Sequence, residues 1–370
     1  MQRLLHGVDV SATESLDYFG EKRAGSREFK TALEISLEAG HIDALKVLLD
    51  HGGAVRVQLP IILRTSSLLE SPTTRCDIPM LEMLLEYVPL DQRNDGGYLV
   101  WGSVVSGMVE SGKTQIVGFF LDLGWEFDAS TSLHDAASGG HTGVASLLLE
   151  RGVIEDIDAR TKRWDGMSAL DLAAKAGKID LIELLMDKGA KLDTSEDGIT
   201  PAHIAAEYGC DDALEFLVHR GVDVNAASDE GTTPIHIATL HYHYSTLELL
   251  IRMGGDVNAR DSKGHAALYH AAKADDFYGQ FYDSPGSPDI ARTYGVNLAW
   301  LLLRNGAALD QQDNNGWTAM DAAVWGGRIG MARVLLMARK LEGIENFASS
   351  LEELYESLEK AHRGDDVPYI

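Results

Sequence analysis

Two histidines, His241 and His243, alternate with tyrosines in the stretch HYHY and are the pair best suited to metal chemistry. Neighbouring imidazoles can bind a metal ion, but protein metal sites usually need three or four ligands. His270 and Asp275 follow further along the chain and could complete such a set. The simpler interpretation is a polar, partly exposed helix end, so we predict no metal site.

Nucleophilic and phosphate-binding chemistry have weaker support. Cys210 is a candidate thiolate, but a reactive cysteine needs a neighbouring base or positive charge that lowers its pKa, and the sequence shows no such arrangement. The stretch SGKT (111–114) is similar to the end of a phosphate-binding loop, yet no strand-like run leads into it. We therefore predict no catalytic residue and no cofactor.

The chain that positions these residues repeats itself. Gly166, Gly198, Gly231 and Gly264 are separated by 32, 33 and 33 residues, and each begins a similar string. The strings are GMSALDLAAKAG, GITPAHIAAEYG, GTTPIHIATLHY and GHAALYHAAKAD, with GWTAMDAAVWGG from Gly316. In three units a second glycine comes 23 residues after the first, shortly after a pair of large apolar residues. Self-similarity at a fixed period of this length indicates a solenoid of stacked units.

These strings resemble the ankyrin repeat, in which Gly-x-Thr-Pro-Leu-His-x-Ala-Ala is followed by Leu-Leu and by Gly-Ala-Asp-Val-Asn-Ala. The nearest matches are TPAHIAAEYG (200–209), TPIHIA (233–238), RGVDVNA (220–226) and GGDVNAR (254–260). The resemblance implies an all-α fold, an ankyrin-repeat solenoid of stacked helix pairs with β-turn fingers. It is clear from about Leu133 to Leu336, and we count about nine units in all.

The repeats divide the chain into four expected segments. Residues 1–27 form an N-terminal cap, residues 28–130 degenerate ankyrin repeats, and residues 131–347 regular ankyrin repeats. Residues 348–370 form a C-terminal capping helix and tail, because SLEELYESLEKAHR (350–363) is amphipathic with an acidic outer face. Caps are needed because one unit cannot bury its own apolar face.

The residue choices within a unit have a physical basis. Thr200 and Thr233 can cap the first helix, and the proline after each fits its first position, where a missing N–H costs nothing. Gly189, Gly221 and Gly254 suit a left-handed residue that ends the second helix. The motif histidines are His134, His203 and His236, and the resemblance implies that their rings hydrogen-bond the backbone within and between units.

The segment DDFYGQFYDSPGSPDIARTYG (275–295) interrupts the pattern. The glycine that should follow Gly264 after 23 residues is Gly306, 42 residues on, so 19 residues are inserted. We expect the first helix to end near Ala274 and the second to begin near Val296. We expect DDFYGQFYD to fold back onto the repeats near residues 241–244, with SPGSP exposed, because its aromatic residues are too many for a solvated loop. They are Phe277, Tyr278, Phe281 and Tyr282. A mobile spacer is the alternative.

The ankyrin resemblance implies that finger tips and the outer faces of first helices line one concave surface. The tip residues are Trp164, Asp165, Glu196, Asp197, Asp229, Glu230, Lys263, Asn314, Asn315 and Trp317. The first-helix residues are Lys175, Tyr208, His241, Lys273 and Trp325. Repeat stacking does not require these side chains, and Trp and Tyr are common interface anchors. We therefore expect a protein partner to bind here and on the four aromatic residues of the insertion.

Composition narrows the partner class. The chain of 370 residues is 45% hydrophobic and carries a net charge of −25, which disfavours nucleic acid and anionic membranes and favours a protein with a basic segment. No apolar run is long enough to span a bilayer, and residues 1–23 lack the apolar core of a secretory signal. The chain has only two cysteines, Cys76 and Cys210, and this low number is typical of a protein in a reducing compartment. We expect a monomeric intracellular protein, cytoplasmic or nuclear.

Three functions remain open on the sequence. The first is a non-catalytic scaffold or adaptor that recognises a partner on a preformed surface. The second is an enzyme or small-molecule binder with a pocket between the insertion and the concave groove, using His241, His243 and Asp275. The third is a substrate adaptor whose degenerate repeats contact a larger assembly. An enclosed pocket with titratable groups would favour the second.

Overall fold

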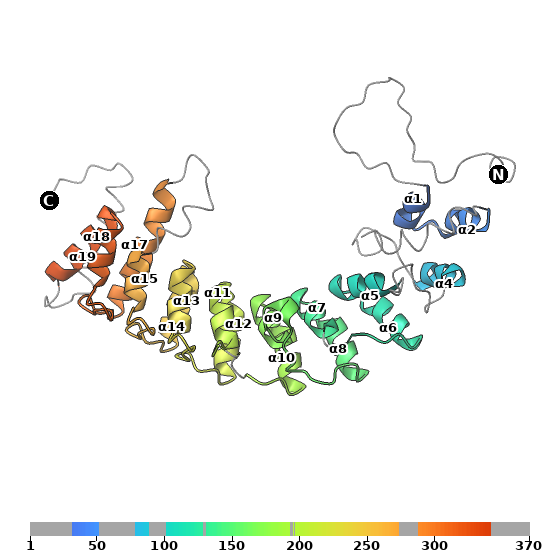
Figure 1. Ribbon diagram of the computed structural model, residues 1–370, viewed down its shortest axis with the longest axis horizontal. Helices are drawn as coiled ribbons and strands as arrows, with labels where there is room; N and C mark the ends of the chain where they lie inside the picture. Colours follow the sequence, from blue (N-terminus) through green and yellow to red (C-terminus); the bar gives the residue numbers. More distant parts are fainter. Residues whose placement is uncertain are drawn as a thin grey trace, which may run out of the picture. The chain divides into compact units, whose positions relative to one another are not determined.

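The computed structural model describes residues 32–51, 78–88, 101–128, 131–192, 195, 197–273 and 288–341 (Figure 1). All regular elements in these residues are helices, as predicted. The chain divides into two compact units, Met1–Ala169 with Asp187–Gly189 and Leu170–Met186 with Ala190–Ile370. No described helix combines the length and the apolar character that crossing a lipid bilayer requires.

The described helices of the first unit are α1 (Ala32–Ala39), α2 (Ile42–His51), α4 (Ile78–Tyr87), α5 (Trp101–Glu110), α6 (Thr114–Asp122), α7 (Ser132–Ser138), α8 (Thr142–Glu150) and the 3-10 helix η1 (Lys162–Trp164). Six of them form pairs, α1 with α2, α5 with α6 and α7 with α8. The pair α5–α6 stacks on the pair α7–α8, with Val117, Phe120 and Leu148 fully buried. The degenerate residues 101–122 therefore form a helix pair like those of the regular repeats.

The second unit continues the same arrangement. Its helices are α9 (Ala169–Lys175), α10 (Ile179–Asp187), α11 (Pro201–Glu207), α12 (Asp211–His219), α13 (Pro234–Leu240), α14 (Tyr244–Arg252), α15 (Ala267–Lys273), α17 (Pro288–Arg304), α18 (Ala319–Trp325) and α19 (Ile329–Leu341). The first helices α11, α13, α15 and α18 stack in that order, and the second helices α12, α14, α17 and α19 stack beside them (Figure 1).

Helix ends follow the predicted chemistry. Thr200 and Thr233 cap α11 and α13, each with a proline at the first helical position. Ala205 and Ala206 are fully buried, which lets neighbouring first helices approach closely. Gly221, two residues after the end of α12, has φ +104°, and Gly189 and Gly254 are left-handed in the same way. The predicted threonine caps and left-handed glycines of the repeat are therefore confirmed.

One turn builds the finger between successive helix pairs. At Ser228 the backbone N–H donates to the carbonyl of Thr232 (2.9 Å), and the carbonyl accepts from Gly231 (2.8 Å). The Ser228 hydroxyl oxygen also accepts from the Thr232 N–H (3.1 Å). The same three hydrogen bonds recur at Ser195, Asp261 and Asp313. The finger is thus a tight turn locked by a serine or aspartate side chain.

The start of the second helix after the insertion was predicted wrongly. Helix α17 begins at Pro288, not near Val296, so residues 288–295 belong to the helix instead of to the turn. Pro288 was expected between the two helices, in the exposed segment SPGSP, but a proline also fits the first position of a helix. Residues 274–287 lie outside the described residues, as do the predicted caps at 1–27 and 348–370, so those predictions stay untested.

Candidate functional site

The finger tips of the second unit are joined directly to one another. The Asp229 N–H donates to the Asp197 carbonyl (3.0 Å), the Ser262 N–H to the Glu230 carbonyl (2.7 Å), and the Asn314 N–H to the Lys263 carbonyl (2.9 Å). These backbone contacts place the tips side by side in a fixed row. The side chains of Asp197, Asp229, Glu230 and Lys263 are exposed on it.

Tyr208, at the end of first helix α11, is 41% exposed. The Lys175 ammonium lies 4.6 Å from the centre of its ring, a cation–π contact between two successive first helices. His241 and His243 are stacked, with ring centres 6.2 Å apart, and His243 Nε2 lies 2.8 Å from the Glu207 carbonyl. Burial is the main cause that lowers the pKa of His241. This histidine pair therefore has one ring already held by the backbone.

Two tryptophans form an exposed aromatic pair at the last described repeat. Trp317, on the finger before α18, packs edge-on against Trp325 at the end of that helix, with ring centres 5.5 Å apart. Their exposed fractions are 37% and 81%. A finger residue and a first-helix residue are thus in contact and both exposed.

Trp164 is in a different situation in the first unit. It is half-buried, and the guanidinium of Arg163 lies 5.6 Å from its ring centre. Arg163 also contacts Glu110 of α5 (2.8 Å) and Asp135 of α7 (3.3 Å). Burial raises the pKa of Asp135, and the charge of Arg163 opposes that rise. The finger around Trp164 is therefore tied to the first helices of its own unit, whereas Asp165 beside it is exposed.

The motif histidines have the structural role that the ankyrin resemblance implied. His236 Nδ1 accepts the Thr233 N–H (3.1 Å), and its Nε2 lies 3.0 Å from the Ala259 carbonyl. His203 Nδ1 accepts the Thr200 N–H (3.1 Å), and its Nε2 lies 2.9 Å from the Thr232 carbonyl, a contact whose equivalent in the next unit is His236 with the His265 carbonyl (3.2 Å). Burial lowers the pKa of both rings, to about 4 for His236, where the charge of His270 adds to the effect. His134 Nε2 lies 3.0 Å from the Ala159 carbonyl.

Both the cysteine and the SGKT stretch make contacts within the repeats. The Cys210 thiol lies 3.4 Å from the Lys175 carbonyl, and burial, helped by Asp211, raises its pKa, which disfavours a thiolate. SGKT forms the turn between α5 and α6, where the N–H groups of Gly112 and Lys113 donate to carbonyls at the end of α5 and the Thr114 N–H donates to the Gly112 carbonyl. These donors are not free to hold a phosphate.

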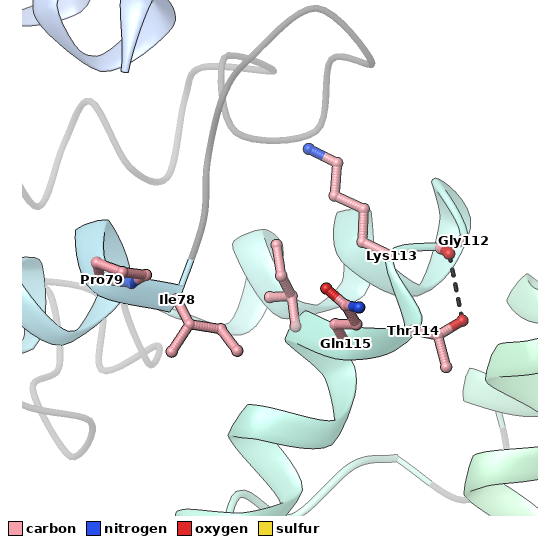
Figure 2. A pocket seen from close by; sticks show the side chains of 7 residues that line it. Ile78, Pro79, Gly112, Lys113, Thr114 and Gln115 are labelled. Carbon is pink, nitrogen blue, oxygen red and sulfur yellow. Dashed lines mark hydrogen bonds between the residues drawn. The ribbon is translucent and has the colours of Figure 1, made fainter. Parts of the chain in front are cut away.

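An open cavity of about 570 Å³ lies beside that turn. Ile78 and Pro79 of α4 line it together with residues 112–116 (Figure 2). The Thr114 hydroxyl donates a hydrogen bond to the Gly112 carbonyl over 3.4 Å, which Figure 2 marks with a dashed line. Among the described residues that line it, Lys113 is the one charged group, so this part of the lining holds no pair of titratable groups that acid–base chemistry would use.

One cluster was missed by the sequence interpretation. Asp261, His265 and His270 bring three potential metal-ligand atoms within 4.8 Å of one another. The signal was a departure from the motif, since Ala266 stands where the two preceding units have Thr200 and Thr233, and Tyr269 where they have His203 and His236. His270 therefore belongs with Asp261 and not with the HYHY pair. Burial alone would raise the pKa of Asp261, but the His270 ring, the His265 N–H and the charge of both imidazoles lower it well below its usual range.

Five predicted binding residues lie outside the described residues. They are Glu196, Phe277, Tyr278, Phe281 and Tyr282. Asp275, which the enzymatic hypothesis required, is outside them as well.

The repeat pattern is matched by a family model described as ankyrin repeats (3 copies), over residues 105–196, 153–228 and 202–280. With the stacked helix pairs and locked fingers, this match makes the chain an ankyrin repeat protein. Ankyrin repeats generally mediate protein–protein interaction, and proteins built from them are typically not enzymes.

Several known proteins are similar to parts of the chain. The ankyrin repeat and KH domain-containing protein mask-1 of Caenorhabditis elegans is 26% identical over 199 residues, 51% of this chain and 7% of that protein. The NF-kappa-B inhibitor cactus of Drosophila yakuba is 36% identical over 100 residues, 25% of this chain and 20% of the inhibitor. Protein phosphatase 1 regulatory subunit 27 of Mus musculus is 37% identical over 66 residues, 18% of this chain and 43% of the subunit. The chain spans less than half the length of each of these relatives.

Proposed function

We propose that this chain is a non-catalytic scaffold or adaptor that binds a protein partner carrying a basic segment. The partner would lie along the finger tips and first helices of the second unit. The observation that carries the proposal is the row of exposed carboxylates on Asp197, Asp229 and Glu230, whose backbones are linked in register. A fixed row of like charges attracts an oppositely charged segment without paying to order itself on binding.

Exposed aromatic residues supply the apolar part of the recognition. Tyr208 and the Trp317–Trp325 pair are exposed, and Trp and Tyr are enriched among residues that dominate binding energy. Two relatives have names that describe regulation of other proteins, an NF-kappa-B inhibitor and a phosphatase regulatory subunit. By analogy we infer a regulatory or adaptor role. Two cysteines in 370 residues support an intracellular location.

The test uses short synthetic peptides that combine Lys and Arg with Leu or Trp, beside acidic peptides of equal length. We expect the basic peptides to bind the full chain and the complex to weaken as salt rises, because exposed charges are screened within about 8 Å at physiological ionic strength. Asp197→Lys with Glu230→Lys should slow association by about ten-fold or more. Surface-plasmon resonance measures both effects.

The matched control reverses the same number of charges elsewhere. Glu215 and Glu248 are exposed on second helices α12 and α14, away from the finger tips. Glu215→Lys with Glu248→Lys should therefore leave peptide association nearly unchanged. Equal losses in the two double variants would reduce the effect to net charge and overturn the proposed site. Peptide binding that does not weaken as the salt concentration rises would rule out a partner recognised through its basic segment.

A further inference from the structure

Three side chains converge between one finger and helix α15. The Asp261 Oδ2 atom lies 3.1 Å from His265 Nδ1 and 3.3 Å from His270 Nε2. Neighbouring ligand atoms around a tetrahedral zinc ion lie about 3.4 Å apart, as bond lengths of about 2.1 Å require. Two of the three pairs therefore have the spacing of neighbouring ligands around a metal ion, and all three atoms lie within 4.8 Å of one another.

The remaining atoms of Asp261 and His265 are already occupied. Asp261 Oδ1 accepts the N–H groups of Lys263 (2.9 Å) and His265 (2.7 Å), which leaves Oδ2 for the cluster. His265 Nε2 lies 3.5 Å from Asp313 Oδ2, and its ring stacks on Tyr269 with centres 4.1 Å apart.

Asp313 has the position of a carboxylate that orients a metal-binding histidine. Its Oδ1 accepts the N–H groups of Asn315 (2.7 Å) and Trp317 (2.8 Å), so its orientation is fixed by the next finger. His265 Nδ1 hydrogen-bonds Asp261 Oδ2 (3.1 Å) and, because a carboxylate only accepts, donates its proton there. If an ion takes the place of that proton, a proton held on His265 Nε2 by Asp313 would leave the Nδ1 lone pair directed at the ion. Carboxylate–histidine–metal arrangements of this kind set the tautomer and the basicity of the ligand.

His270 provides the third ligand atom. Its Nε2 is buried and, within the described residues, has no hydrogen bond of acceptable geometry although Asp261 Oδ2 is 3.3 Å away. Two atoms that are close but poorly aligned for a hydrogen bond are better placed to bind an ion that lies between them than to bond each other. A buried ring nitrogen without such a bond otherwise costs free energy.

We propose that Asp261, His265 and His270 bind one divalent transition-metal cation of the zinc class, with Asp313 as the positioning residue behind His265. Two imidazoles and one carboxylate suit Zn²⁺ and leave a further coordination position for water or another donor. The carboxylates of Asp261 and Asp313 together balance the charge of a divalent ion. The bound ion would join a finger to the first helix of its repeat.

The test titrates the tag-free full chain, stripped with a chelator, with Zn²⁺ in a calorimeter and with Co²⁺ followed by visible absorption. We expect one tightly bound equivalent and a Co²⁺ spectrum of low coordination number. His270→Gln and Asp261→Asn should each weaken binding by at least about ten-fold, and Asp313→Asn should weaken it less. Asp261→Asn keeps the oxygen that locks the finger, so the fold should be retained.

The control is His219→Gln, because His219 is an exposed histidine at the end of α12. It should bind the metal as the wild type does. The absence of a stoichiometric equivalent in the wild type overturns the proposal, as does binding that survives both His270→Gln and Asp261→Asn. If a variant fails to fold by circular dichroism, histidine NMR of the wild type decides. Paramagnetic Co²⁺ must then perturb His265 and His270, and perturbation of other histidines alone refutes the site.

Discussion

The backbone N–H of Asp229 donates to the carbonyl of Asp197 over 3.0 Å, so that one finger tip rests directly on the next. The contact is close because Gly198 follows Asp197. A Cβ atom at Gly198 would lie 2.9 Å from the Asp229 nitrogen, closer than packed atoms tolerate. The row of acidic tips therefore depends on a glycine with no side chain at this position.

Gly198→Ala should destabilise the chain more than Gly166→Ala. Both glycines have φ +74°, so the left-handed strain, about 1–2 kcal/mol, is common to the two variants. A Cβ at Gly166 would meet nothing within 4 Å, whereas at Gly198 it meets backbone. We expect Gly198→Ala to lose about 1 kcal/mol more in urea unfolding. Equal losses would show that the finger contact can shift at no cost.

Stability should fall as pH decreases through the range set by His236. Burial, with the charge of His270, lowers the pKa of the folded ring from 6.5 to about 4. The unfolded chain therefore binds the proton first, and stability present above pH 6.5 is lost between pH 6.5 and about 4. The loss from this ring amounts to at most about 3 kcal/mol. His203 acts in the same direction.

The measurement is urea unfolding of the wild type and His236→Gln across that pH range. The variant should be less stable at neutral pH and should show a shallower decline toward low pH. His219→Gln serves as the control and should keep the wild-type slope, since its ring is exposed. A wild-type slope in His236→Gln would mean that other groups carry the pH dependence.

The sequence predicted the elements that repeat and missed those that do not. Helix caps at Thr200 and Thr233 and the histidine contacts of His203 and His236 follow from a motif that recurs with fixed spacing. The start of α17 at Pro288 has no such template, because proline is compatible both with a turn and with a first helical turn.

The candidate sites divide in the same way. The placement of exposed Asp229 and Trp325 was predictable from their positions in the repeat. The Asp261–His265–His270 cluster was not, because it joins a finger and a helix through residues that replace the motif. The inward position of Trp164 was also missed, since it depends on Arg163 meeting Asp135 of an earlier repeat.

Arg163→Ala should cost far more stability than Arg151→Ala. Arg163 pairs with Asp135, whose side chain is only 2% exposed, so its removal leaves a buried carboxylate without its counter-charge. Because half of the Arg163 side chain is exposed, we expect about 1–3 kcal/mol, less than for a fully buried pair. Arg151 pairs with Asp122 at 2.8 Å with both side chains exposed, and its loss should cost below about 0.5 kcal/mol.

The pH dependence and a double variant make the Arg163 prediction specific. The pKa of Asp135 is already raised by burial and should rise further without Arg163, so protonation relieves the unpaired charge. The cost of Arg163→Ala should therefore shrink as pH falls from neutral toward the raised pKa.

Asp135→Asn should restore much of the stability lost in Arg163→Ala, because it removes the carboxylate charge that the first substitution leaves unpaired. Urea unfolding of the single and double variants measures the coupling. A cost that is constant with pH and additive with Asp135→Asn would assign the role of Arg163 to its contact with Trp164 instead.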